Sequence, residues 1–272
     1  MSNSINTNVG AMVALASVRA TQSALNSAAK QVQTGYRIAD AADDASTFSV
    51  AQGIRGNLQA HQAVQGSLAN GVGLGSVTQA ALTGLSNLIG NMQAKLTQLA
   101  DGSLNFNQQI IYFNDFYQIT TQMQNFIDQA NYNGTNLLSA GSVSKTFLSD
   151  VNAGTLTMAS QSSVYGAFTA FATTAIIPAS QAAAAIVSLT TFQQAVAIAL
   201  GANAAETRTL KLQSNFVSSI VDATTTGLGA IVDADIGKAS ASVQALQVRQ
   251  QLGIQSLAIA NQQPSVLLGL FR

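Results

Sequence analysis

Apolar and small residues recur at alternating spacings of four and three positions near both ends of the chain. This heptad-like spacing is typical of amphipathic helices that pair along a coiled-coil seam, and small residues on a seam allow close approach. Two ordinary amphipathic helices within a bundle would show the same spacing. The N-terminal row comprises Ala11, Leu15, Val18, Gln22, Leu25, Ala29 and Val32, and the C-terminal row comprises Ile236, Ala239, Val243, Leu246, Gln250, Gly253, Leu257 and Ala260.

The faces opposite these two rows carry almost no charge. The first 39 residues hold only three charged side chains, Arg19, Lys30 and Arg37, and all eleven acidic residues fall between Asp40 and Asp235. Across the chain only 8% of residues are Asp, Glu, Lys or Arg, against the ~25% usual for soluble proteins. A helix with little charge on any side is usually buried all round. Both ends therefore look like one kind of segment, suited to burial inside an assembly.

Between residues 43 and 140 the pattern predicts at least two more helices. Asp43 and Asp44 favour a helix start through the helix dipole. The stretch that follows, to about residue 99, is helical in pattern but rich in glycine. Because glycine weakens a helix, this indicates either close helix packing or a break around residues 70–73. A third helix is predicted over about residues 104–130, and Asn133-Gly134 predicts the turn that ends it.

Residues 142–177 lose the helical period. Two short runs, residues 146–148 and 155–158, flank a turn-rich segment and predict a β-hairpin. The rest of this stretch is rich in Ser, Thr and Ala and is predicted to be non-helical and exposed. Pro178 is predicted to open the next helix, which continues to about Val221.

No arrangement of side chains points to catalysis, a cofactor or a metal. The single histidine, His61, has no ligand cluster around it, and the chain has no cysteine and no GxSxG motif. Residues 71–75 lack the GxGxxG spacing of a dinucleotide-binding loop, and Asp43-Asp44 is more typical of a helix start than of a metal site. We therefore predict that the chain is not an enzyme and binds no cofactor or metal.

Net charge and hydropathy restrict the possible partners. The formal net charge is zero, so the chain lacks the positive surface that binds nucleic acid. No uninterrupted apolar run approaches the ~18 residues of a membrane span, so no membrane insertion is expected. Residues 1–8 lack the basic and apolar regions of a secretory signal peptide, which by itself would indicate a cytoplasmic protein.

Several short blocks resemble the sequences of bacterial flagellins. TGYRIADAADDA at residues 34–45 is similar to the family's SGxRIxxAxDDAA, and YNGTNLL at residues 132–138 resembles FNGxxLL. Asn70-Gly71-Val72 stands where the family commonly has Asn-Asp-Gly-Ile. The first block, SINTN at residues 4–8, and the last, residues 251–272, resemble the two family termini. Together these blocks frame about residues 1–140 and 205–272.

The resemblance implies a mainly α fold: a hairpin-shaped subunit with a terminal coiled coil, a helical bundle and a small β-hairpin tip. Residues 1–42 would pair with residues 235–272 as the inner core, and residues 43–140 and 190–234 would form the bundle. Residues 141–189 would be a variable, surface-exposed tip. The expected polymerisation seam consists of Leu15, Val18, Leu25, Val32, Val243, Leu246, Leu257 and Ala260.

For function, the resemblance implies a structural subunit that polymerises into the extracellular filament of the bacterial flagellum, which drives swimming. It also implies export through the flagellar type III channel without a cleaved signal peptide, which overrides the cytoplasmic interpretation. The expected partners are other copies of the chain and, by family resemblance, the filament cap, hook-junction proteins and an export chaperone. A hook–filament junction protein, which shares the terminal pattern, is the alternative.

Many flagellins carry an LQRxRELA segment, which a host Toll-like receptor recognises through its two arginines and its glutamate. An ungapped alignment from residues 71–72 onward places residues 89–95 on that segment. Asn91 and Gln93 then stand at the arginine positions, and Ala94 stands at the glutamate position. The low charge of the whole chain is the simpler explanation of these residues. In either case the resemblance implies a degenerate receptor-recognition segment, because charge-assisted hydrogen bonds are about twice as strong as neutral ones.

Overall fold

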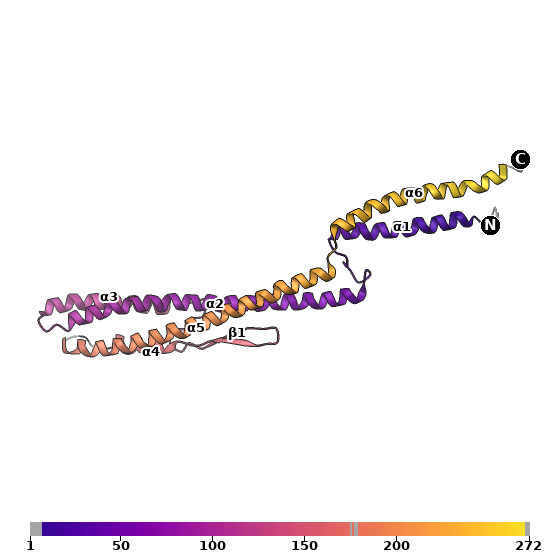
Figure 1. Cartoon of the computed structure of the whole chain (residues 1–272). Coiled ribbons are helices and arrows are strands. Elements are labelled where there is room, and N and C mark those ends of the chain that lie inside the picture. Colours follow the sequence, from indigo (N-terminus) through magenta and orange to yellow (C-terminus); the bar gives the residue numbers. More distant parts are fainter. Residues whose placement is uncertain (1–6, 175, 177–178, 270–272) are drawn as a thin grey trace. The chain divides into compact units, whose positions relative to one another are not determined.

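The computed structural model describes residues 7–174, 176 and 179–269 (Figure 1). The mainly α fold is confirmed, with one short antiparallel hairpin in the described part of the chain. Pro178, the expected helix opener, lies outside the described residues. The elements are α1 (Val9–Thr34), α2 (Ala45–Leu99), α3 (Phe106–Asp128), β1 (Lys145–Leu148), β2 (Thr155–Met158), α4 (Ser162–Ala172), α5 (Ala179–Val232) and α6 (Ile236–Gly269).

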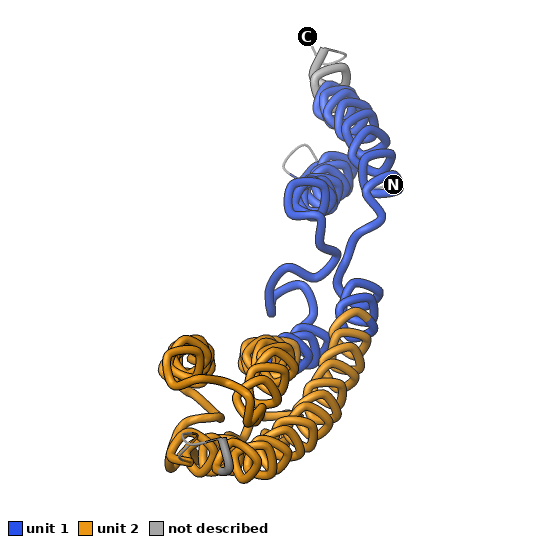
Figure 2. The backbone as a smooth tube through the Cα atoms, turned by 90° about the vertical axis from the view of Figure 1, so that its left-hand side faces the viewer, with its two compact units in different colours: residues 1–56, 223–272 blue, residues 57–222 orange. Residues whose placement is uncertain are grey.

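The chain forms two compact units, shown in different colours in Figure 2. The first comprises residues 1–56 and 223–272, and the second comprises residues 57–222. Helices α2 and α5 therefore contribute residues to both units. The first unit contains the paired chain ends, and the second contains the larger apolar core.

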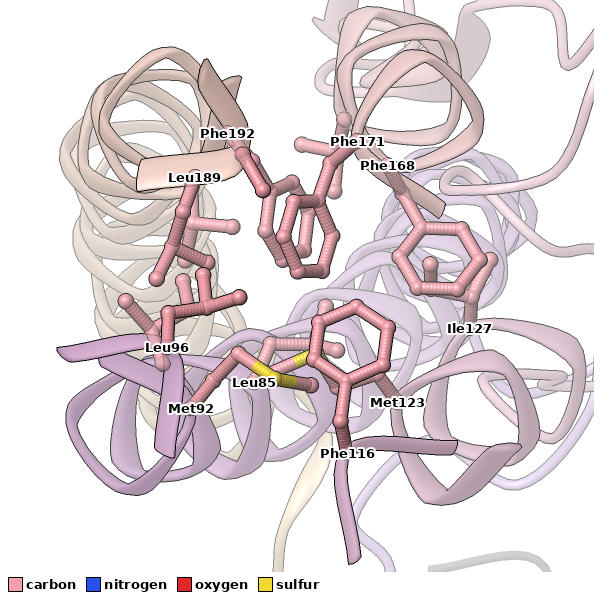
Figure 3. Close-up of a cluster of buried hydrophobic side chains, with 14 of the residues drawn as sticks. Leu85, Met92, Leu96, Phe116, Met123, Ile127, Phe168, Phe171, Leu189 and Phe192 are labelled. Carbon is pink, nitrogen blue, oxygen red and sulfur yellow. The ribbon is translucent and has the colours of Figure 1, made fainter. Parts of the chain in front are cut away.

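The core of the second unit is built by four helices around a group of phenylalanines (Figure 3). The rings of Phe171 and Phe192 stack with centroids 6.2 Å apart, while Phe116 meets Phe171 edge to face at 5.6 Å. Such pairs stabilise a core beyond the area that they bury. Around them lie Leu85, Met92 and Leu96 of α2, Met123 and Ile127 of α3, Phe168 of α4 and Leu189 of α5.

The prediction that residues 142–177 contain no helix is wrong for α4, Ser162–Ala172. The sequence of α4 has no acidic residue in its first turn and no side-chain cap, so the usual start signals are missing. Its helical state depends on tertiary packing, because Val164, Phe168 and Phe171 are buried in the aromatic core. Residues 141–189 therefore do not form a separate exposed tip: the part from α4 onward belongs to the core of the second unit.

The predicted β-hairpin is confirmed, in the register that pairs Phe147 with Leu156. Hydrogen bonds join the hairpin to the two long helices α2 and α5. The Leu148 N–H donates to Ser67 Oγ of α2 at 2.9 Å, and Gln213 Nε2 of α5 donates to the Ser149 carbonyl at 2.8 Å. The hairpin strands thus rest on the helices, and its exposed loop spans residues 151–153.

Helix α2 runs through its glycines without a break, so the first of the two alternatives, close packing, holds. A Cβ at Gly75 would lie 2.2 Å from Thr207 Oγ1 of α5, and one at Gly84 would lie 2.8 Å from the Phe126 ring of α3. The absence of side chains at these positions lets neighbouring elements approach the α2 backbone. Helix α5 extends to Val232, beyond the end expected near Val221.

Replacing Gly75 by alanine is expected to destabilise the second unit by about 1–3 kcal/mol, because the added methyl overpacks the contact with Thr207. Gly66→Ala is the matched control on the same helix, since a Cβ there meets nothing within 4 Å. That control should gain up to about 1 kcal/mol from helix propensity. Urea unfolding of the monomeric variants measures both changes. A Gly75→Ala variant as stable as Gly66→Ala would contradict the packing argument.

Candidate functional site

Helices α1 and α6 pair in antiparallel fashion within the first unit (Figure 1). Contacts along the pair join the start of α1 to the end of α6 and then run in opposite directions. Asn8 Nδ2 donates to the Ala260 carbonyl at 2.7 Å, and Gln250 Nε2 donates to Gln22 Oε1. Between these contacts, a Cβ at Gly253 would lie 2.9 Å from Val18 Cγ2. Glycine at position 253 therefore sets how closely the two helices approach.

The C-terminal row expected from the sequence faces α1 in the structure. Ala239 is buried, and the positions that follow at alternating spacing are half-buried. Ile236, at the start of the row, is exposed. The half-buried positions are Val243, Leu246, Gln250, Gly253, Leu257 and Ala260.

The N-terminal row is only partly correct. Val18 and Leu25 are half-buried as expected, but Leu15 and Val32 are each 37% exposed. The most buried positions of α1 are instead Thr21 and Ala28, so the seam row is Ala11, Ala14, Val18, Thr21, Leu25 and Ala28. The alternating spacing alone placed Leu15 on the row, whereas a closely approached seam favours its smaller neighbour, Ala14.

Asn8 has two structural roles that periodicity could not reveal. Its Oδ1 accepts the Ala11 N–H at 3.0 Å and caps the start of α1, while its Nδ2 bonds across to α6. Asparagine is among the preferred residues for such a cap. Asn8 therefore joins the start of α1 to the last part of α6.

The outer sides of both helices expose large apolar side chains. Val13 on α1 and Ile259 on α6 are each 65% exposed. Contiguous apolar surface of this kind on a folded chain marks an interaction site. The other exposed apolar residues of the pair include Val9 and Met12 on α1, and Val248, Leu252 and Ile254 on α6.

The segment between α1 and α2 joins the ends of several helices in the first unit. Gly35 ends α1 in the left-handed conformation, with φ 75°, which glycine adopts without strain. Arg37 N–H donates to the Val232 carbonyl at 2.7 Å, and Ala234 N–H donates to the Gly35 carbonyl at 2.9 Å. Ile38 is buried beside them. The block at residues 34–45 that resembles flagellins thus forms a compact connection to the end of α5.

Lys30 links α1 to this connection by two ion pairs. Its Nζ lies 2.6 Å from Asp40 Oδ2 and 2.9 Å from Asp43 Oδ2. These hydrogen bonds raise the pKa of Lys30, and together with backbone N–H donors they lower the pKa of Asp40 and of Asp43. Asp43 Oδ2 also accepts the Ala39 N–H at 2.9 Å. Asp44, the neighbouring carboxylate, caps α2 through the Ser46 and Thr47 N–H groups.

Acid is expected to loosen the connection at residues 35–44. Because the folded pKa values of Asp40 and Asp43 lie below 3.8, their stabilising effect is complete above that pH and is lost as pH falls through the lowered values. NMR titration of the two carboxyl groups checks this. In the control variant Lys30→Met, both midpoints should move up toward the ordinary value. Unchanged midpoints in that variant would show that the ion pairs have no influence.

The three residues of the expected recognition segment lie on the exposed side of α2. Asn91, Gln93 and Ala94 are exposed, whereas Ile89 and Met92 are buried in the aromatic core. Lys95 forms an ion pair with Asp115 of α3 at 2.8 Å. In a single chain, a partner could therefore reach these three positions.

Two further observations concern chemistry and membranes. In the described ranges, no group of three or more His, Asp or Glu lies close enough to hold a metal. Gln181–Val232 of α5 contains an 18-residue window with mean hydropathy 1.6, which is long and apolar enough to cross a membrane. Polar residues interrupt this window, so the absence of a long uninterrupted apolar run did not reveal it. The same helix contributes Phe192 and Val196 to the core of the second unit.

Terminal helices that pair with each other and turn apolar surface outward define a subunit of a larger helical assembly. Residues 5–142 match the family model of the bacterial flagellin N-terminal helical region, and residues 181–271 match that of the bacterial flagellin C-terminal helical region. The chain belongs to the bacterial flagellin family.

Individual relatives agree with this membership over nearly the whole chain. Flagellin FljK of Caulobacter vibrioides is 32% identical over 270 residues, covering 99% of each chain. The flagellin of Brucella melitensis is 31% identical, also covering 99% of each chain. The crystal structure of Bacillus cereus flagellin matches with a TM-score of 0.50 and 20% identity, over 56% of this chain and 88% of that one. At this identity, the last comparison shows a shared fold only.

Proposed function

We propose that this chain, a structural subunit of the bacterial flagellar filament, enters the filament through the paired helices α1 and α6. The observation that carries the proposal is the apolar outer surface of this pair, which is exposed in a single chain. The observed seam row of α1 and the row from Ala239 to Ala260 of α6 would hold the two helices together, and the outer residues would contact neighbouring copies. Covering this apolar surface with neighbouring copies would be favourable in water.

Burial in the filament would supply the stability that the pair lacks alone. The described residues of α1 include only two that are buried, Thr21 and Ala28. Ordering a residue costs about 1–2 kcal/mol of backbone entropy, whereas ~1,000 Å² of apolar area shared with neighbours would contribute about 25 kcal/mol before other costs. Folding of the two ends is therefore coupled to assembly.

The following residue ranges are assigned to layers of the filament by their place in the sequence. Residues 1–42 and 235–272 would form the inner core of the filament, and residues 43–140 and 190–234 would form the surrounding bundle. Residues 141–189 would face outward at the hairpin loop, while α4 supports the bundle from within. We assign the chain a structural and not a catalytic role, since its family is one of structural proteins.

The flagellin relatives place the chain in the extracellular filament. Export without cleavage of a signal peptide, and contacts with a filament cap, hook-junction proteins and an export chaperone, remain proposals that follow from family membership. No finding favours the alternative, a hook–filament junction protein. The mass of the subunit recovered from filaments would test the export proposal, because a cleaved signal would shorten the chain.

Polymerisation of the purified chain tests the main proposal. Monomer seeded with short filament fragments, or treated with precipitating salt, is expected to form long filaments that electron microscopy resolves. A junction protein would form short or no polymers under the same conditions. Failure of the seeded full-length chain to elongate would overturn the assignment.

A further inference from the structure

The outer side of α5 in the second unit carries a second unpartnered stripe. Ile198 is 73% exposed, and Val187, Leu212 and Phe216 are exposed with it. Their separations of 11, 14 and 4 residues bring them to one side of a helix with 3.6 residues per turn. This side is opposite the one that contributes Phe192 to the core.

The positions between these apolar residues are small or uncharged. They extend the stripe at spacings of three and four, as in a seam that receives another helix. Two exposed cations, Arg208 and Lys211, lie beside them. The intervening exposed positions are Thr191, Gln194, Gly201, Ala205 and Thr209.

Helix α3 carries an exposed row of bulky apolar side chains, in contrast to the small residues at the centre of the α5 stripe. Phe106, Ile110, Phe113 and Tyr117 recur at spacings of four, three and four and are all exposed. Beside this aromatic ridge lies an open groove of ≈ 570 Å³ between α3 and α4, lined by Phe113, Phe116, Tyr117, Phe168, Ala172 and Ile176, among others. The second unit thus bears one bulky aromatic ridge and one stripe with small residues at its centre.

We propose that in the filament the α3 ridge, Phe106 to Tyr117, packs along the α5 stripe, Val187 to Phe216, of a neighbouring copy. The inference rests on the proposed function, which supplies neighbours that are copies of the same chain. Bulky side chains on one surface fit a seam with glycine and alanine at its centre. The residues that form the ridge and the stripe are themselves uncharged, so packing them together buries none of their own charge. Because the two surfaces are different parts of one chain, the contact is heterologous, which is the kind of contact that can repeat along a filament.

A second copy is a better occupant of the α5 stripe than a lipid bilayer. Thr191, Gln194 and Thr209 lie within the stripe, and polar groups in a lipid-facing surface are costly. Arg208 and Lys211 follow closely on the same exposed part of the helix. A protein surface tolerates these groups, because side chains or water can satisfy them.

The absence of cysteine from the chain makes cross-linking a direct test. Filaments are assembled from an equal mixture of a Thr121→Cys copy, placed beside the ridge, and a copy carrying Thr191→Cys, Ala205→Cys or Thr209→Cys. A short bismaleimide reagent is then added. Gln193→Cys is the matched control on α5, exposed but turned away from the stripe.

At least one stripe position is expected to give a cross-linked dimer at about ten times the control yield, in filaments and not in monomers. Filaments that form normally but cross-link no better than the control would overturn the proposal. If the unmodified chain forms no filaments, the proposed function fails instead, so the two outcomes are distinguishable.

The variant Ile198→Gln provides an independent measurement. Because this side chain is already exposed in the single chain, the unfolding of the monomer should not change. The monomer concentration required for polymerisation should rise about tenfold. An unchanged concentration would contradict the contact. Binding of the unmodified monomer to phosphatidylcholine–phosphatidylglycerol vesicles, abolished by Ile198→Gln, would assign the stripe to lipid and likewise overturn the proposal.

Discussion

Deletion of residues 1–30 or of residues 245–272 is expected to abolish polymerisation while the second unit stays folded. Either deletion removes most of one helix of the α1–α6 pair and most of its apolar outer surface. Neither removes a residue of the aromatic core, whose buried members lie between Leu82 and Ala199. Circular dichroism of the truncated monomer should therefore show a helical signal that still melts cooperatively, while sedimentation and electron microscopy should detect no filaments.

A point substitution separates the loss of pairing from the loss of outer contacts. Val13 is 65% exposed on α1, so Val13→Asp should leave the monomer unchanged and reduce filament yield at least about tenfold, because burying an unpaired charge is costly. Val13→Ile is the matched control and should polymerise normally. Filaments of ordinary length from either truncated chain would show that α1 and α6 are not the assembly site.

The sequence predicted the paired ends because their signal is local and repeated. The row on α6 from Ala239 to Ala260 follows the heptad spacing without ambiguity and faces α1 as expected. On α1 the same spacing fits two neighbouring rows, since small residues flank each candidate position. The burial of Thr21 and Ala28, with Leu15 and Val32 exposed, selects one of them. Spacing thus indicates an apolar row on each helix, whereas contact with the partner helix determines which row forms the seam.

Local sequence patterns could predict neither helix α4 nor the packing role of the glycines in α2. Residues 162–172 have weak helix signals, and their state depends on Phe168 and Phe171 reaching the core formed by distant segments. Similarly, Gly75 would weaken an isolated helix, but in the fold it admits Thr207. Tertiary contacts override propensity at such positions. Two of the blocks that resemble flagellins, residues 34–45 and 132–138, lie in the connections that follow α1 and α3, where turns depend on the local sequence.

The unmodified monomer is expected to be almost silent to the Toll-like receptor that recognises the LQRxRELA segment of other flagellins. Asn91, Gln93 and Ala94 are exposed in the structure but offer neither the two guanidinium groups nor the carboxylate. Truncating one partner of a buried charged pair costs ~2–5 kcal/mol, so losing three should weaken binding by several orders of magnitude. A receptor-reporter assay on purified monomer measures this directly, with an enteric flagellin as the positive reference.

Restoring the three charges gives a more stringent test of this prediction. The triple variant Asn91→Arg, Gln93→Arg and Ala94→Glu should keep its fold, because all three side chains point away from the core that holds Ile89 and Met92. Its potency should rise at least about a hundredfold, since each regained charge-assisted hydrogen bond is about twice as strong as a neutral one. The matched control places the same three residues at Gln52, Gln59 and Gln62, exposed positions of α2 outside the segment, and should remain silent. Enteric-level potency from the unmodified chain would refute the argument, and so would a triple variant no more active than the control.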